Sequence, residues 1–492
     1  MKDKNIIILG GGSAGWLTAL FAQRTFPNNS ITLIESKKIG ILGAGEGSTP
    51  HLPGFLKQLG IDPLDLLIKT GGTIKQGISF ENWNGDNKKY FHGFSELNQL
   101  GNYNINNIFG SDCSDYYLKH LIKNNLDFDE HLYAPYISYK NKVDLERVSY
   151  ALHFDAHSLA EYLKNIGVDR GIKLIDGDYK NLQQINGDIT KIILQDGREF
   201  NTDFVFDCTG FARLLIGEYY KSKWIDYQKY LPIKKAIPFF LKREYKEITP
   251  YTQAIAMKYG WVWKIPLQHR FGAGYIFDSD YINEEQALEE AEQLFGRKLE
   301  VPKVIPFTAG RYEDVWINNC LSIGLSSGFT EPLEATSLFL TVKQLELLRH
   351  YVSEMNDSSL SKENYNKTVG NNADEMMYFL YLHYLTERKD SPFWSEFKEK
   401  HPTPPGFVSL LEKLKQLNVK YFDFEKQYVT GNFPLNAHLI VGKGLNLFNS
   451  KINISGYEEL NPTVFETKER MMRYEKQSLY HSEFLNDLSI RK

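Results

Sequence analysis

The sequence predicts an α/β protein whose amino-terminal part is a doubly wound parallel sheet, and three observations lead to this fold class. Residues 5–9 form a short β-branched run that ends in glycines, and residues 16–25 favour a helix. A second strand follows at 31–35. Similar short strands return at 203–210 and 320–328, and each ends in small residues, which suit the ligand-binding edge of a parallel sheet.

These strands lie far apart in the sequence, so we expect the nucleotide-binding domain to be assembled from separate segments. The segments are 1–85, 151–225 and 306–355. The chain has 492 residues, enough for a second unit. We expect that substrate-binding unit to comprise an insertion at 86–150, an antiparallel sheet at 226–305 and a helical tail at 356–492.

Charge and hydropathy argue against several classes of partner. The net charge is −4, from 57 basic and 61 acidic residues, which provides no basic field for nucleic acid or for an anionic membrane. The amino-terminal apolar run is too short for a signal peptide, and no stretch is long enough to span a bilayer. We therefore expect a soluble, cytoplasmic protein with a small-molecule partner, and a homodimer stays open.

The cysteines and the aromatic residues are less informative. Cys113, Cys208 and Cys320 form no CxxC pair and no zinc-ligand spacing, so we expect buried, inert thiols and no metal site. Aromatic residues make up 14% of the chain and would suit a pocket for a planar ligand. An aromatic core is the simpler interpretation of that composition alone.

A glycine-rich turn follows the first predicted strand and satisfies the pattern G-x-G-x-x-G. Its missing side chains permit a tight turn, close approach of a pyrophosphate and tight packing of the next helix. Glu35 lies 20 residues after the last of these glycines, at the end of the next strand, where it would accept hydrogen bonds from a ribose. This context favours a dinucleotide site over a purely structural turn. The expected contacts of the turn are Gly10, Gly12, Ser13, Ala14 and Gly15.

The segment DCTGFARLL at 207–215 selects between dinucleotides. It resembles the late strand-end motif with which flavoproteins of the glutathione reductase type close over FAD, and Asp207 and Gly210 are its expected contacts. The resemblance favours FAD over NAD. It implies a glutathione-reductase-like FAD-binding domain that carries an inserted and carboxy-terminal, largely helical substrate domain.

The stretch GWVWKIP at 260–266 resembles the G-W-x-W-x-I-P signature of flavin-dependent tryptophan halogenases, with Trp261, Trp263 and Pro266 in register. In that family the tryptophans form a wall beside the flavin that keeps it from the substrate. Ordinary core aromatics are the alternative. The resemblance extends from residue 5 to about 395 and includes HFDAH at 153–157 and HYLTERKDSPFW at 383–394.

The segment GTIKQGISFENW at 72–83 is similar to the one that carries the family's active-site lysine, which implies that role for Lys75. Ile74, Ile78 and Phe80 flank this lysine. A strand would therefore hold its stem among apolar neighbours, and desolvation would lower its pKa. A solvated surface lysine is the alternative.

The segment GLSSGFTEPLEATS at 324–337 resembles the family's flavin and halide segment. Helical spacing over 338–352 places Thr336 and Ser337 at a helix start, where unpaired N–H groups and the positive helix end suit a halide. Glu334 matches the family's active-site glutamate, and a helix-capping carboxylate is the alternative. The implied flavin contacts are Gly324, Leu325, Ser327 and Gly328.

Two further matches concern the surroundings of the flavin and the substrate. GAGEGSTP at 43–50 looks like the family's mobile flavin loop, and its glycines would let it act as a lid. His92 and Phe94 match an H-x-F pair that lines the family's substrate pocket, with a histidine in a surface loop as the alternative. The implied flavin contacts of the loop are Gly45, Glu46, Gly47 and Ser48.

The resemblance implies a halogenase that uses diffusible reduced FAD from a separate flavin reductase. O2 and a halide (chloride, bromide or iodide) would yield hypohalous acid, which Lys75 would direct to an electron-rich aromatic carbon while Glu334 accepts the departing proton. The family's cluster for gripping free tryptophan is not recognisable at 400–450, so the expected substrate is an aromatic of indole or phenol type. A flavin hydroxylase or oxidase and a flavin-binding protein without turnover are the alternatives.

Overall fold

The computed structural model describes residues 3–39, 45–94, 133–243, 246–351, 359–416, 432–447, 469 and 472–491. Cys113, the first two residues of GAGEGSTP and residues 95–132 of the expected insertion lie outside these described residues. Cys208 and Cys320 are buried, as expected, and burial raises the pKa of both thiols. None of the described helices is long and apolar enough to cross a membrane.

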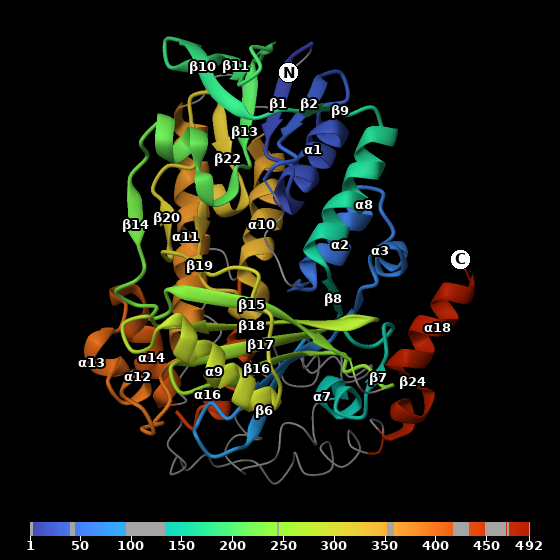
Figure 1. Cartoon of the computed structure of the whole chain (residues 1–492), viewed down its shortest axis with the longest axis vertical. Helices are drawn as coiled ribbons and strands as arrows, with labels where there is room; N and C mark the ends of the chain where they lie inside the picture. Colours follow the sequence, from blue (N-terminus) through green and yellow to red (C-terminus); the bar gives the residue numbers. More distant parts are fainter. Residues whose placement is uncertain are drawn as a thin grey trace, which may run out of the picture.

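The predicted strands at 5–9, 31–35, 203–210 and 320–328 lie together in one six-stranded sheet (Figure 1). Adjacent strands are parallel, except for the antiparallel pair β21–β22 at one edge. In sheet order the strands are β21 (Trp316–Ile317), β22 (Cys320–Ser322), β13 (Phe204–Asp207), β1 (Asn5–Leu9), β2 (Ser30–Glu35) and β9 (Lys173–Asp176).

Three helices pack close to this sheet and share its apolar core. They are α1 (Ser13–Thr25), α8 (Ala156–Asp169) and α10 (Thr336–Tyr351), and α1 contacts both of the others. The helix predicted over 338–352 is thus present and begins two residues earlier. Two short sheets flank the core: β10 (Tyr179–Ile185), β11 (Asp188–Leu194) and β12 (Glu199–Asn201), and β14 (Trp224–Asp226), β20 (Gly310–Tyr312) and β23 (Gly328–Phe329).

A second large sheet of seven strands lies below the first in Figure 1. All of its strand pairs are antiparallel except β5–β16. The strand β5, which follows Lys75, comes from the amino-terminal part of the chain and joins the sheet there. In sheet order the strands are β19 (Ile305–Pro306), β15 (Lys235–Lys242), β18 (Arg270–Phe277), β17 (Gly260–Pro266), β16 (Thr252–Ala256), β5 (Gly77–Glu81) and β6 (Lys89–Gly93).

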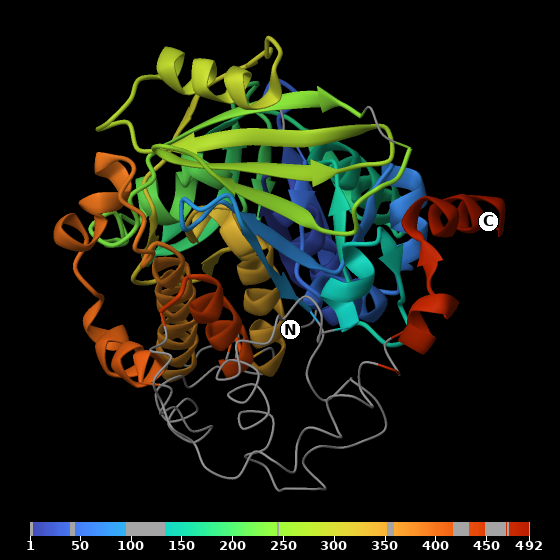
Figure 2. The same cartoon turned by 90° about the horizontal axis from the view of Figure 1, so that it is seen from below.

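Helices cover both faces of the seven-stranded sheet (Figure 2). On one face α9 (Glu284–Phe295) packs over Val262, and on the other face helices of the carboxy-terminal part pack against Trp261. The alternation of a strand thereby sends neighbouring residues of GWVWKIP into different cores. The carboxy-terminal helices are α11 (Ser359–His383), α12 (Pro392–Ser395), α13 (Phe397–Lys400), α14 (Val408–Lys415) and α16 (Leu435–Gly444).

A small three-stranded sheet joins the two large ones. It has the order β3 (Glu46–Gly47), β8 (Ala151–Phe154) and β4 (Thr73–Lys75), and α2 (His51–Gln58), α3 (Pro63–Thr70) and α7 (Tyr133–Ser138) lie around it. The chain runs from β4 through Gln76 directly into β5 of the seven-stranded sheet. Lys75 therefore lies at the point where one strand leaves the small sheet and enters the large one.

The glycine-rich turn between β1 and α1 shows why its glycines are not equivalent. Gly10 has φ +116°, and a Cβ there would lie 2.1 Å from the carbonyl oxygen of Cys208. A Cβ on Gly15 would lie 1.9 Å from the carbonyl oxygen of Gly10, whereas one on Gly12 would meet nothing within 4 Å. Gly10 and Gly15 are therefore required by the fold, while Gly12 leaves open space for a ligand.

Substituting Gly10 and Gly12 separately tests this distinction. Gly10→Ala should lower the free energy of unfolding by about 1–3 kcal/mol because alanine is strained at this φ, whereas Gly12→Ala should stay within about 1 kcal/mol of the parent. Gly12→Ala should instead weaken FAD binding by about 1–3 kcal/mol through overpacking. Chemical denaturation and flavin-fluorescence titration measure the two quantities. Full FAD affinity in Gly12→Ala would contradict close approach of the ligand at this turn.

Candidate active site

Lys75 is buried at the end of β4, with 1% of its surface exposed. Its Nζ donates a hydrogen bond to the carbonyl oxygen of Ser48 at 3.0 Å and lies 5.4 Å from the centroid of the Phe94 ring. Burial lowers the pKa of Lys75 to about 8, although the nearby charge of Glu334 opposes the shift. Lys75 is buried, and the flanking Ile74 and Ile78 are buried as well, so the alternative of a solvated surface lysine is wrong.

A relay of side chains fixes β4 against the seven-stranded sheet. Thr73 Oγ1 donates its proton to the carbonyl oxygen of Pro266 at 2.7 Å. The Thr73 hydroxyl oxygen therefore accepts from Nδ1 of His153, at 3.0 Å. The Nε2 of His153 then accepts from Thr252 Oγ1 at 2.9 Å. Burial holds the pKa of His153 well below its usual range, in agreement with this neutral tautomer. Pro266 thus contributes its backbone to holding the strand of Lys75.

Glu334 lies in the turn before α10 and is 3% exposed. Its backbone is left-handed, with φ +62°, and that of Ala335 is left-handed too, with φ +58°. Its Oε1 accepts hydrogen bonds from Nδ1 of His92 at 2.8 Å and from Nε2 of His383 at 3.2 Å. The alternative of a helix-capping carboxylate is therefore wrong, because the two histidines and not the helix start hold the side chain.

The charge of Glu334 is stabilised despite its burial. Burial alone would raise the pKa of Glu334, but the charge of His92 and the hydrogen bonds from His383 and His92 outweigh this effect and hold the pKa far below its usual value. Both hydrogen bonds that described residues make to this carboxylate go to Oε1. Oε2 is consequently left for another partner.

His383, at the end of α11, is a site residue whose role the sequence did not indicate. Its Nδ1 lies 2.8 Å from the carbonyl oxygen of Phe379, and its Nε2 faces Glu334. His383 thus contacts the carboxylate and the backbone of its own helix at the same time. A histidine within the apolar run MMYFLYLHYL was the available signal.

His92 and Phe94 were expected to line a substrate pocket, with a surface loop as the alternative for His92. His92 lies in β6 and is buried, so the surface-loop alternative is wrong. Its ring faces Phe94 edge to face at a centroid distance of 6.5 Å and Phe379 at 5.8 Å. Together with Lys75, these residues place two aromatic rings beside the buried charges.

The predicted halide residues lie at the first turn of α10, as their sequence pattern indicated. Thr336 Oγ1 donates to the carbonyl oxygen of Glu331 at 3.0 Å. Ser337 Oγ is shielded from solvent, and no described residue forms a hydrogen bond with it. A buried hydroxyl with an unused proton next to the unpaired N–H groups of a helix start is a suitable receptor for an anion.

The two tryptophans of β17 occupy different surroundings. Trp261 is buried, and its Nε1 donates to Oε1 of Glu331 at 3.3 Å. Trp263 is half-buried and packs over Gly274, where a Cβ would lie 2.1 Å from its ring. No role for Glu331 was predicted from the sequence. Burial raises its pKa to about 8, and both of its oxygens accept from the hydroxyl of Tyr384, at 2.7 and 2.8 Å.

The predicted flavin contacts gather at one edge of the six-stranded sheet. The neighbouring parallel strands β22, β13, β1 and β2 end beside one another, and each is followed by a predicted segment. A Cβ on Gly11 would lie 2.0 Å from Oε2 of Glu35, so the carboxylate reaches the glycine turn. The residues at these four strand ends are Gly10, Gly12, Ser13, Ala14, Gly15, Glu35, Asp207, Gly210, Gly324, Leu325, Ser327 and Gly328.

Within this set, Asp207 has a role that the motif alone did not indicate. Its carboxylate accepts hydrogen bonds from the N–H groups of Leu215 and Ile216, each at 2.9 Å, and from the N–H and hydroxyl of Thr209 at 3.0 and 2.6 Å. It therefore shapes the turn that contains Gly210. Gly210 itself has φ +64° and open space where a Cβ would be.

The described part of the predicted lid lies against the lysine. A Cβ on Gly47 would lie 3.1 Å from Lys75 Nζ, and one on Gly45 would lie 3.0 Å from Gly272 Cα. Burial raises the pKa of Glu46 to about 7, with a further contribution from the charge of Asp155. Ser48 supplies the carbonyl that accepts from Lys75. This loop therefore contacts both the lysine and the second sheet.

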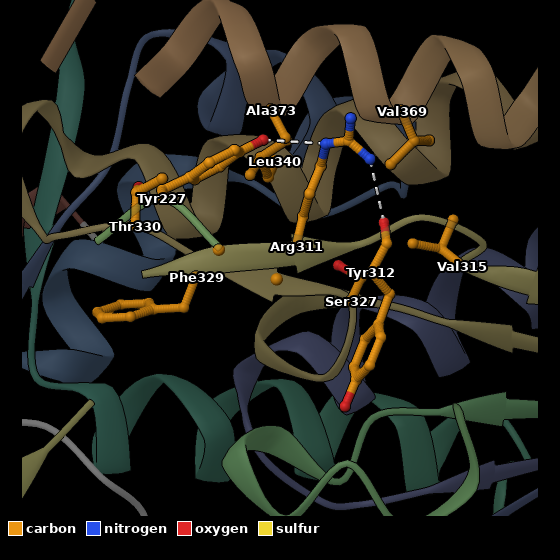
Figure 3. A pocket seen from close by; sticks show the side chains of 12 residues that line it. Tyr227, Arg311, Tyr312, Val315, Ser327, Phe329, Thr330, Leu340, Val369 and Ala373 are labelled. Atoms are coloured by element: carbon orange, nitrogen blue, oxygen red, sulfur yellow. Dashed lines mark hydrogen bonds between the residues drawn. The ribbon is translucent and has the colours of Figure 1, made fainter. Parts of the chain in front are cut away.

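A small cavity lies behind the segment expected to contact the flavin, between β20, β23, α10 and α11 (Figure 3). Ser327, Gly328 and Thr330 form part of its wall. Arg311 reaches into it and donates from Nε to the hydroxyl of Tyr227 at 2.9 Å and from Nη2 to Asp374 at 3.0 Å. The charge of Arg311 is thereby compensated. Elsewhere in the described ranges, no group of three or more His, Cys, Asp or Glu side chains could hold a metal ion.

Known proteins resemble this chain over most of its length. A family model described as tryptophan halogenase matches residues 5–444. The tryptophan 6-halogenase of Streptomyces toxytricini is 30% identical over 439 residues, which are 83% of each chain, and the tryptophan 7-halogenase of Lentzea aerocolonigenes is 31% identical over 425 residues, which are 81% of this chain and 79% of the other.

Solved structures agree with these matches. A flavin-dependent halogenase from Xanthomonas campestris superposes with a TM-score of 0.89 at 27% identity over 99% of both chains, and one from Brevundimonas superposes with a TM-score of 0.86 at 28% identity over the same shares. The fold is accordingly the mixed α/β fold of flavin-dependent halogenases over nearly the whole chain. This chain belongs to the tryptophan halogenase family and is a flavin-dependent halogenase.

Proposed function

We propose that this halogenase separates the production of its oxidant from the use of the oxidant, with Lys75 as the group that transfers the halogen and Glu334 as its partner. The observation that carries the proposal is the buried pair itself, an amine with a lowered pKa near a carboxylate held ionised by two histidines. Perturbed ionisable groups of this kind are typical of catalytic sites.

The residues at the edge of the six-stranded sheet fit FAD. Gly12 leaves space at the start of α1, Glu35 lies against the same turn, and Gly210 leaves space on the next strand. We expect these residues to hold the dinucleotide and Asp207 to act through the turn that it shapes. Bound reduced FAD supplies the electrons with which O2 and a halide ion give hypohalous acid and water. We propose that a separate flavin reductase provides the reduced FAD.

The first turn of α10 is the proposed halide site. The N–H groups of Thr336 and Ser337 and the unpaired hydroxyl of Ser337 would surround the anion next to the positive helix end. Trp261 and Trp263, on the face of the second sheet, are proposed to wall the flavin off from the organic substrate. Glu331 would fix the orientation of Trp261 through its hydrogen bond.

At Lys75 the lowered pKa decides which chemistry is available. With a pKa of about 8, about one lysine in ten carries a neutral amine at pH 7, against roughly one in three thousand at the ordinary value. The neutral nitrogen can attack the halogen of hypohalous acid, forming an N–halogen bond and releasing water. An electron-rich ring carbon then takes the halogen as the N–halogen bond breaks, and Glu334 accepts the ring proton and returns it to the nitrogen, which restores the neutral amine.

The proposed substrate is an aromatic of indole or phenol type. Two of the relatives named above, those from Streptomyces toxytricini and Lentzea aerocolonigenes, are tryptophan halogenases, and the rings of Phe94 and His92 near Lys75 suit a planar substrate. The pocket would select the position of halogenation by presenting one ring carbon to Lys75, because hypohalous acid alone discriminates little between ring carbons.

Substitutions at Lys75 test whether production of the oxidant and transfer of the halogen are separate steps. With a flavin reductase, FAD, O2 and a halide, Lys75→Ala should consume oxygen at the parent rate yet lower haloarene yield by about 10²-fold or more, because the reacting atoms are no longer positioned. Lys75→Arg should fail too, because a guanidinium stays protonated. Glu334→Gln should cost about 10²–10³ in rate by removing charge and proton acceptance.

Oxygen uptake and chromatography of haloarene in the same reaction provide both readouts. Lys242→Ala is the matched control, because Lys242 is exposed at the end of β15 and should leave both readouts unchanged. Full yield at one defined ring position from Lys75→Ala would show that the pocket alone steers the oxidant. Product that forms equally without halide would overturn halogenation itself.

The pH dependence tests the protonation state of Lys75. Folding lowers the pKa of this lysine, so the ammonium predominates below about pH 8 and the neutral amine above it. Haloarene formed per O2 consumed should therefore rise about tenfold per pH unit below 8 and level off above. A yield that falls as the pH rises through 8 would instead mean that the ammonium acts, as a hydrogen-bond donor to hypohalous acid.

A further inference from the structure

The carboxy-terminal segment returns to the strand that carries Lys75. Residues 472–491 lie beyond the region that the family model matches and include β24 (Leu479–Tyr480) and α18 (His481–Arg491). β24 pairs with β7 (Lys142–Val143), and α18 contacts α3 (Figure 1). Lys142 and Glu475 form an ion pair at 2.7 Å, and the hydroxyls of Tyr133 and Ser478 lie 2.6 Å apart.

The first residue of α18 is inserted between β4 and the segment that precedes β16. His481 is fully buried, its Nε2 accepts from the N–H of Ile74 at 3.0 Å, and its Nδ1 donates to the carbonyl oxygen of Ile248 at 3.2 Å. Burial lowers the pKa of His481 to about 3, so the imidazole is neutral and its Nε2 keeps a lone pair. The pattern defines one tautomer with both nitrogens occupied.

The register explains why an imidazole is needed there. β5 and β16 pair in parallel with Ile78 opposite Thr252, and the N–H of Gln76 continues this pattern by donating to the carbonyl oxygen of Pro250 at 2.7 Å. Two residues earlier, the corresponding groups are the N–H of Ile74 and the carbonyl oxygen of Ile248. Both bind His481 at this point, so the imidazole takes the place of one direct backbone hydrogen bond.

The N–H of Ile74 has no alternative partner in its own sheet. Leu152, which lies opposite Ile74 in β8, directs its N–H to Ser48 Oγ and its carbonyl oxygen to the N–H of Ser48. The backbone N–H of Ile74 therefore points away from β8, toward the open edge of β4. Without His481 this buried N–H would lose its acceptor, which costs about 1–3 kcal/mol.

We propose that His481 is a positioning residue for halogenation, which bridges β4 and the segment that precedes β16 and thereby fixes Lys75, the next residue after Ile74, in its buried position. This inference rests on the proposed role of Lys75. It assigns a function in the reaction to a segment that lies 407 residues from Ile74 in the sequence.

Three substitutions of His481 in the full-length chain test the bridge. His481→Leu removes both hydrogen bonds, His481→Asn is long enough to reach only Ile248, and His481→Gln can still accept from Ile74. We expect unchanged oxygen uptake in all three. Haloarene per O2 consumed should fall on the order of tenfold to a hundredfold in the Leu and Asn variants, as for misplaced reacting groups, and His481→Gln should restore most of it.

The pH profile gives a readout that simple loss of folded protein would not change. If β4 shifts and water reaches Lys75, the midpoint near pH 8 should move upward in the Leu and Asn variants and stay in place in His481→Gln. Ser482→Ala is the matched control, because within the described part of the chain the hydroxyl of this neighbour donates to Glu247 alone, at 2.9 Å, and its loss should change nothing. If His481→Leu does not fold, the test rests on the comparison of His481→Asn with His481→Gln.

Unchanged yield and midpoint in His481→Asn, or failure of His481→Gln to the same extent as His481→Asn, would overturn the proposal. Lys75→Ala in the same assay keeps the two questions separate. If that variant halogenates normally, the proposed role of Lys75 is wrong. The titration midpoint of Lys75, measured directly by NMR of labelled lysine in the His481 variants, would then still show whether the bridge positions the strand.

Discussion

Two opposite charges, the ammonium of Lys75 and the carboxylate of Glu334, are buried in the same region, and much of the surrounding structure serves to make this tolerable. Uncompensated buried charges are costly, so each requires partners. Glu334 has two imidazoles on one oxygen, whereas Lys75 has the carbonyl of Ser48. The asymmetry keeps the carboxylate ionised and lowers the pKa of the amine. A left-handed backbone at Glu334 and Ala335, which costs about 1–3 kcal/mol for each residue, turns the carboxylate toward its histidines.

The strand of Lys75 is held from every direction by residues that are distant in the sequence. Thr73 bonds to Pro266 in the second sheet, and Ile74 bonds to His481. The glycine loop that ends at Ser48 belongs to the small sheet, so the lid, the lysine and the second sheet share one set of contacts. This arrangement links the glycine-rich edge of the six-stranded sheet, the proposed flavin site, to a lysine at the border of another sheet. It also keeps water away from the amine, on which the lowered pKa depends.

Local patterns were sufficient for the strands, the glycine turn and the burial of Lys75, because each depends on neighbours within a few residues. The first strand occurs where its β-branched run predicted it, and the apolar flanks of Lys75 did bury it. The partners of Glu334 were beyond such reasoning, since His92 is 242 residues away and meets it only in the folded chain. The capping alternative for Glu334 was reasonable from position alone and is wrong because two histidines, and not the helix start, hold its side chain. His481 has no local signal, because its two bonds fill a gap between β4 and the segment that precedes β16.

The protonation state of Lys75 is the central claim, and it is directly measurable. NMR of the protein labelled with ¹³C at lysine Cε, titrated from neutral to alkaline pH, gives the titration midpoint of each lysine, and Lys75→Ala assigns the resonance of interest. The account predicts one resonance that titrates near pH 8 and is absent from that variant. A midpoint at the ordinary lysine value near 10.5 would contradict it, because the amine would then be protonated throughout the working range.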